Sequence, residues 1–128
     1  MNFYLLDAAA PGLVFGLMII FMIVTIVLEA LAMIIMKYNK AGKAFLDSFL
    51  ANLVSLGAGF LILFSGSGLF EIADSAMLSI AILFLVTVVI EFFILYLLNR
   101  KLSVQKTLMA AIVINLISYL LYSLIQFL

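Results

Sequence analysis

Long apolar stretches alternate with short polar breaks along this chain, and this pattern predicts four membrane-spanning helices. Each apolar stretch has the roughly 20 residues that a helix needs to cross a bilayer. The four stretches cover residues of about 12–36, 44–64, 76–98 and 107–127. The first and third breaks, at 37–43 and 99–106, are only a few residues long, so each of them joins two antiparallel helices.

Composition agrees with a membrane protein and excludes several classes of function. Of the 128 residues, 70% are apolar and only 9% are charged, whereas about a quarter of the residues in a soluble domain are charged. The chain has no cysteine and no histidine, which excludes disulfides, zinc fingers, His-ligated haem and Ser-His or Cys-His catalytic couples. We therefore expect an all-α polytopic membrane protein with a single transmembrane domain, residues 1–128.

The charged residues predict the orientation of the chain in the membrane. All six basic residues lie in the first and third breaks: Lys37, Lys40, Lys43, Arg100, Lys101 and Lys106. In a chain with four spans these two breaks share one side, and the positive-inside rule places that side in the cytoplasm. Asp7, Glu71 and Asp74 then lie outside, together with both termini. The expected location is the cell (inner) membrane.

Scarce polar residues recur in the same order in the two halves of the chain, which predicts an internal repeat. The sequence VTIVLE at 24–29 matches VTVVIE at 86–91, and NLVS at 52–55 matches NLIS at 115–118. The offset is 62 residues in the first block and 63 in the second. Apolar matches carry little information in this composition, but matches of Thr, Glu, Asn and Ser are informative because these residues are rare here.

Each repeat, about 12–64 and 76–127, would be a hairpin of two helices. Two spans return the chain to its starting side, so the two hairpins run parallel and are related by a pseudo-two-fold axis along the membrane normal. The expected fold is therefore a four-transmembrane-helix bundle built from two parallel two-helix hairpin repeats.

The repeated polar side chains are expected to meet at one depth in this bundle. An α-helix rises about 1.5 Å per residue, which places the repeated Glu and Asn about 12–13.5 Å inside the basic breaks. The half-thickness of the hydrocarbon region is about 15 Å, so this depth is close to the midplane. The central residues are Glu29, Glu91, Asn52 and Asn115, and the polar residues about one turn away on the same faces are Thr25, Thr87, Ser55 and Ser118.

Two intramembrane acids indicate a functional site, because a carboxylate at the bilayer centre costs several kcal/mol or more. Such a residue faces the bundle interior or a wet cavity. Three arrangements would satisfy Glu29 and Glu91. Each acid is protonated and donates to an amide or hydroxyl group, or the two share one proton, or they hold a cation. Carboxylate, amide and hydroxyl oxygens suit a hard cation such as Na⁺, Mg²⁺, Ca²⁺ or Mn²⁺, and no other cofactor is expected.

The same residues also have a structural interpretation. Asn and Ser side chains hydrogen bond between membrane helices, with about 0.6 kcal/mol per contact, and a protonated Glu bonded to Asn would fix helix register.

For Thr25 and Thr87 we expect hydrogen bonds to carbonyls of their own helix. Asp47 lies four residues after Lys43 and is expected to pair with it. Since Ala110 stands at the matching position of the second repeat, Asp47 is excluded from the site.

The leading functional hypothesis is a small carrier or channel for a cation or for protons, in which Glu29 and Glu91 bind the ion. One four-helix bundle offers little room for a pathway, so a homodimer or larger assembly is expected. The alternative is a non-transporting subunit that binds a partner protein or lipid within the bilayer through a stripe of small residues: Ala44, Ser48, Ala51, Ser55 and Gly59. We expect neither an enzyme, since no nucleophile–base couple is evident, nor a nucleic-acid partner.

Overall fold

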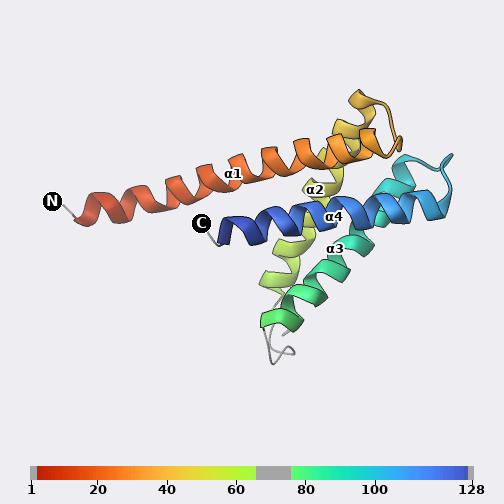
Figure 1. Cartoon of the computed structure of the whole chain (residues 1–128). Helices are drawn as coiled ribbons and strands as arrows, with labels where there is room; N and C mark the ends of the chain where they lie inside the picture. Colours follow the sequence, from red (N-terminus) through yellow and green to blue (C-terminus); the bar gives the residue numbers. More distant parts are fainter. Residues whose placement is uncertain (1–2, 66–75, 127–128) are drawn as a thin grey trace.

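Four α-helices form the whole of the fold in the computed structural model, which describes residues 3–65 and 76–126 (Figure 1). They are α1 (Phe3–Ile35), α2 (Ala41–Phe64), α3 (Ala76–Leu98) and α4 (Val104–Gln126). Each contains a segment long and apolar enough to cross a membrane: Pro11–Ile35, Ala41–Ile62, Leu78–Leu98 and Val104–Leu124. The prediction of an all-α protein with four helices long and apolar enough to cross a membrane is confirmed.

Three helices begin earlier than the apolar stretches that predicted them, and in α2 and α4 the reason is that hydropathy does not detect a polar first turn. The first helix begins at Phe3 rather than near residue 12 and continues through Pro11. The second and fourth begin three residues before the predicted starts. In α4 the Ser103 hydroxyl oxygen accepts a hydrogen bond of 3.2 Å from the backbone N–H of Lys106. This is the arrangement of a helix N-cap, and it allows α4 to begin among polar residues.

The helices pack in a cyclic order, so that each contacts two neighbours. The packed pairs are α1 with α2, α2 with α3, α3 with α4, and α4 with α1. In Figure 1, α1 and α4 run side by side, as do α2 and α3, and the two pairs converge toward the short connectors. Away from the connectors the pairs spread apart. The four helices are therefore closest together in the half of the bundle that carries the short connectors.

Small residues make this close approach possible. Fully buried alanines lie in all of the helices except α3: Ala30, Ala44, Ala51, Ala110 and Ala111. Larger side chains, among them Met33, Leu95 and Ile114, fill the space between them. Small side chains let helix backbones approach one another in a membrane, and short polar side chains can then bridge between helices.

The small-residue stripe of α2 is part of this internal packing. Ala44, Ser48 and Ala51 have no exposed surface, whereas Gly59, further along the same helix, is exposed. The half of the stripe nearer the connectors is therefore covered by the chain's own helices and is not available to a partner protein.

Enlarging a residue of the stripe is expected to destabilise the protein. Ala51→Leu should lower the free energy of unfolding by about 1–3 kcal/mol, because the added atoms must displace packed neighbours. Gly59→Leu is the matched control, since a Cβ added at Gly59 meets no atom within 4 Å. Unfolding in mixed detergent micelles measures both variants. An equal loss of stability in the two would contradict internal packing of the stripe.

The two basic connectors lie at the same end of the bundle and contact each other, in agreement with the pattern of basic residues. The Asn39 side-chain amide donates to the side-chain carbonyl oxygen of Asn99 at 2.9 Å. The Lys106 ammonium donates to the backbone carbonyl of Lys37 at 2.8 Å. Which side of the membrane this end faces stays a prediction. Of the acids expected at the opposite side, Asp7 lies in α1, while Glu71 and Asp74 lie outside the described residues.

Candidate functional site

The two glutamates are buried inside the bundle, one on α1 and one on α3. Glu29 is 1% exposed and Glu91 is 3% exposed. Each accepts a hydrogen bond from the asparagine that sequence analysis grouped with it. The Asn52 amide on α2 donates to Glu29 Oε2, and the Asn115 amide on α4 donates to Glu91 Oε2 at 2.7 Å. These two bonds link α1 to α2 and α3 to α4.

Two serines extend this bonding to the remaining helix pairs. The Ser118 hydroxyl on α4 donates to Glu29 Oε1, and the Ser55 hydroxyl on α2 donates to Glu91 Oε1 at 2.9 Å. Each serine lies three residues after the asparagine of its helix, on the same face. These side chains thus form a group that joins all four helices through two hydrogen-bonded sets, one around each glutamate. We call it the polar ring: Glu29, Asn52, Ser55, Glu91, Asn115 and Ser118.

Ser48 also contacts the polar ring, although sequence analysis placed it only in the small-residue stripe. Its hydroxyl lies 2.8 Å from Glu29 Oε2 and 3.2 Å from the backbone carbonyl of Ile26. Ala111 occupies the matching position in the second half and has no hydroxyl. Glu29 therefore has three side-chain donors and Glu91 has two. The signal that identifies Ser48 is its position one helical turn before Asn52, on the same face.

The two threonines behave differently. Thr87 donates to the carbonyls of Leu83 and Phe84 in its own helix, both at 2.9 Å, as expected. The Thr25 hydroxyl is buried, with only 4% of the residue exposed, and it has no hydrogen-bond partner among the residues that the structure describes. An unpaired buried hydroxyl costs about 1–3 kcal/mol. Thr25 lies one turn from Glu29 on the same helix face, so its free hydroxyl adds to the polar surroundings of that acid.

The polar ring can hold Glu29 either as a carboxylate or as a carboxylic acid without displacement of its heavy atoms. The Ser118 hydroxyl lies 3.0 Å from the backbone carbonyl of Ile114, and Ser48 has a similar second acceptor in its Ile26 contact. A hydroxyl has one hydrogen and can rotate it. When the hydrogen points to Glu29, the serine stabilises a carboxylate. When it points to the backbone carbonyl, the serine oxygen can accept a proton donated by Glu29.

The ring directs donors rather than ligand oxygens at the two acids. Both asparagines point their NH₂ groups at a glutamate oxygen, whereas a hard cation would need the amide oxygen. Residues 3–65 and 76–126 contain no group of three or more His, Cys, Asp or Glu side chains that could hold a metal ion. In this arrangement both asparagine amides act as donors to the acids.

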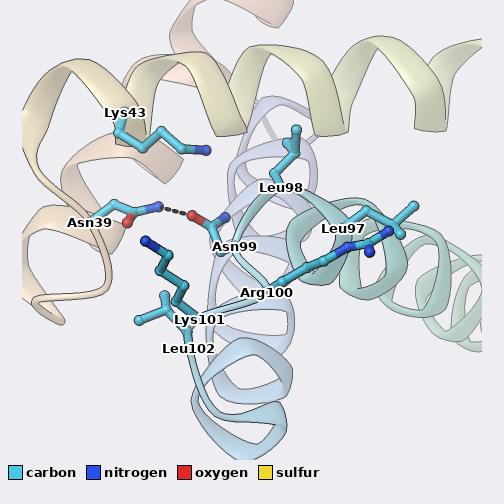
Figure 2. A pocket seen from close by; sticks show the side chains of 8 residues that line it. All are labelled: Asn39, Lys43, Leu97, Leu98, Asn99, Arg100, Lys101 and Leu102. Carbon is cyan, nitrogen blue, oxygen red and sulfur yellow. Dashed lines mark hydrogen bonds between the residues drawn. The ribbon is translucent and has the colours of Figure 1, made fainter.

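A third acid is buried at the connector end, outside the polar ring. Asp47 has no exposed surface, and it forms the predicted ion pair with Lys43. It also accepts hydrogen bonds from the amides of Asn39 and Asn99, the latter at 2.8 Å. Figure 2 shows the two asparagines bonded to each other. We call Asp47, Lys43, Asn39 and Asn99 the connector cluster, and sequence analysis did not identify its two asparagines.

Tyr38 makes a further link between the first connector and α4. Its hydroxyl donates to the Thr107 hydroxyl oxygen at 3.4 Å, and only 3% of Tyr38 is exposed. Burial raises the pKa of the Tyr38 phenol above its ordinary value, and the nearby charge of Asp47 acts in the same direction, while the bond to Thr107 opposes both. The phenol is therefore neutral at physiological pH and acts as a donor.

The polar ring has no basic side chain to neutralise it. The only ion pair within the described ranges is the one between Lys43 and Asp47. The chain has no significant match among protein-family models, curated proteins or solved structures. The functional inference therefore follows from two buried acids that each accept hydrogen bonds from both neighbouring helices and that form no ion pair within the described residues.

Proposed function

We propose that this protein is a small membrane carrier or channel that moves protons, or a cation in exchange for protons, through the polar ring. The observation that carries the proposal is that two buried glutamates, Glu29 and Glu91, each accept hydrogen bonds from both neighbouring helices, so that these bonds together join all four helices. Because an intramembrane acid costs several kcal/mol, two of them without a basic partner are better explained by the uptake and release of charge than by packing alone.

The serine hydroxyls support protons as the charge that moves. A proton site must be stable in both of its states, and the hydroxyls of Ser48 and Ser118 have an acceptor for each state of Glu29. A hard cation remains the alternative ligand of the same acids. It would require both asparagine side chains to turn their oxygens toward the glutamates.

The proposal includes an internal repeat of two parallel hairpins. If the two halves are exchanged, the Asn–Glu bond between α1 and α2 corresponds to the one between α3 and α4. The Ser–Glu bond between α4 and α1 likewise corresponds to the one between α2 and α3. This correspondence supports a pseudo-two-fold axis that passes through the polar ring. Each half would then contribute one acid, one amide and one hydroxyl group.

Matched serine substitutions test this symmetry. Ser55→Ala and Ser118→Ala should each lower the free energy of unfolding by about 0.5–1.5 kcal/mol, because each removes one hydrogen bond to a glutamate. The two losses should agree within about 0.5 kcal/mol. Ser123→Ala is the control, since the Ser123 hydroxyl bonds only to its own helix among the contacts described. Loss of stability in one ring variant but not in the other would argue against equivalent halves.

Access to the ring is proposed from the ends of the helices that lie away from the short connectors. The helix pairs spread apart in that direction (Figure 1), and Thr25 lies on that side of Glu29 with its unpaired hydroxyl. The connector cluster holds the opposite end together. Since one bundle offers little room for a complete pathway, we propose a homodimer as the working unit in the cell membrane.

Dissipation of a pH gradient in liposomes tests the proposed function. Liposomes that contain the purified protein should lose an imposed pH gradient faster than protein-free liposomes, and the rate should scale with the amount of protein. A rate equal to that of protein-free liposomes, across imposed gradients of both directions and with Na⁺ or K⁺ present, would contradict the proposal.

A non-transporting membrane subunit is the second candidate function. The observation that favours it is that all four oxygens of Glu29 and Glu91 already accept a hydrogen bond, so the ring could serve only to fix helix register. A partner would then contact the exposed apolar faces of the helices within the bilayer. Co-purification of a membrane protein, together with absence of flux from the isolated chain, would favour this function.

A further inference from the structure

An open cleft of about 450 Å³ lies at the connector end, away from the polar ring. It is lined by the end of α3, by the connector that follows α3 and by the start of α2, and three basic residues face it: Lys43, Arg100 and Lys101. In Figure 2 the amino ends of Lys43 and Lys101 lie on either side of the Asn39–Asn99 hydrogen bond, and Arg100 lies further along, beside Leu97.

The positive charge of this cleft is largely uncompensated. No acidic residue lines the cleft. Lys43 shares its charge with the buried Asp47 behind the cleft. Arg100 and Lys101 are exposed and form no ion pair within the part of the chain that the structure describes. The cleft therefore presents two free cations and a third that is partly neutralised.

The cleft also has an apolar wall at the level where the membrane surface is expected. Its apolar lining residues are Leu97, Leu98 and Leu102. The third span ends at Leu98, so the cleft lies where the hydrocarbon region gives way to polar head groups. Leu97 is 53% exposed beside Arg100. Basic side chains next to leucines match a ligand with an anionic oxygen group and an apolar chain.

We propose that this cleft binds a phosphate group. Lys101 and Arg100 would contact the phosphate oxygens, with Lys43 as an additional donor, since ammonium and guanidinium groups are usual donors to phosphate in proteins. The leucine wall fits the phosphate of an anionic phospholipid, and a soluble phosphate would use the same donors. The site is separate from the polar ring, so it does not depend on whether the ring transports protons.

Lipid binding to the purified protein in detergent tests the proposal. Native mass spectrometry should show tighter binding of phosphatidylglycerol than of phosphatidylcholine. In the double variant R100Q/K101Q the affinity for phosphatidylglycerol should fall about 25-fold, about fivefold for each basic side chain removed. The matched control is K37Q/K40Q, which removes two exposed basic residues from the same end but outside the cleft.

The outcomes separate a built site from diffuse attraction. Loss of affinity in R100Q/K101Q with binding retained in K37Q/K40Q supports the cleft, whereas equal loss in both variants, or no loss in either, overturns it. Should the double variant fail to fold, K101Q alone is expected to lose affinity about fivefold.

In a second experiment, inorganic phosphate is added to lipid-free protein. If phosphate stabilises the wild-type protein but not K101Q, the ligand is a soluble phosphate. If the protein prefers phosphatidylglycerol and phosphate does not stabilise it, the ligand is a lipid. If the wild-type protein shows neither stabilisation by phosphate nor a preference for phosphatidylglycerol, the proposal is overturned.

Discussion

Proton flux through the double variant E29Q/E91Q is expected to fall to the rate of protein-free liposomes. Glutamine has nearly the shape of glutamate and keeps one oxygen that can accept from the serines and asparagines of the ring. It cannot take up or release a proton. The substitution therefore removes the proposed chemistry while it leaves the packing of two buried positions almost unchanged. The decay of an imposed pH gradient, followed with an enclosed pH-sensitive dye, measures the flux.

The single variants and a conservative control sharpen this prediction. E29Q and E91Q should each lose most of the flux, and their effects should not add, because both acids belong to one proposed proton pathway. E29D/E91D retains both acids with shorter side chains and should keep part of the flux. If E29Q/E91Q inserts, folds and conducts as well as the wild type, the polar ring is not the pathway.

Asp47→Ala is expected to produce the largest loss of stability of any single substitution considered. Asp47 has no exposed surface, and its removal leaves three donors without their acceptor: the Lys43 ammonium and the amides of Asn39 and Asn99. Breaking a buried ion pair costs about 3–5 kcal/mol. Because the Lys43 side chain is 39% exposed and can be hydrated, we expect a loss of about 2–3 kcal/mol, in the range for buried groups left unpaired.

Two comparisons distinguish this effect from a general intolerance of the position. Asp47→Asn retains an acceptor oxygen and should lose less stability than Asp47→Ala. Lys43→Met should also lose less, since Asp47 would keep both amide donors. Free energies of unfolding from detergent-based denaturation give all three values. Alanine stands at position 110, which is 63 residues after Asp47. If Asp47→Ala caused no loss of stability, the connector cluster would contribute nothing to the free energy of unfolding.

Hydropathy alone was sufficient to predict the four helices, because the alternation of apolar stretches and polar breaks has one simple solution in a bilayer. The helix ends were less predictable. The fourth helix begins at Val104 among polar residues, where the Ser103 cap rather than hydropathy determines the start. The start of α1 at Phe3 was also not predicted, because the apolar stretch that indicated this helix begins only after Asp7 and Pro11.

The polar ring was predictable to a greater degree than the connector cluster. Its residues are rare polar groups in long apolar helices, and helix periodicity determines which face and depth they occupy. Ser48 was not predicted because Ala111 lies 63 residues after it, so that the recurrence of polar residues gives no signal at this position. Asn39 and Asn99 lie in or next to the connectors, whose backbone path cannot be derived from periodicity. Their meeting at Asp47 is a property of the folded chain.

Infrared spectroscopy of the protein reconstituted in lipid is the most direct test of a proton site in the polar ring. The carboxyl region is recorded as pH is varied, for the wild type and for E29Q/E91Q, and the difference between the two removes the signals of all other acids. We predict that a protonated-carboxyl band remains in this difference and changes with pH. Identical spectra for the two proteins would contradict proton uptake by Glu29 and Glu91.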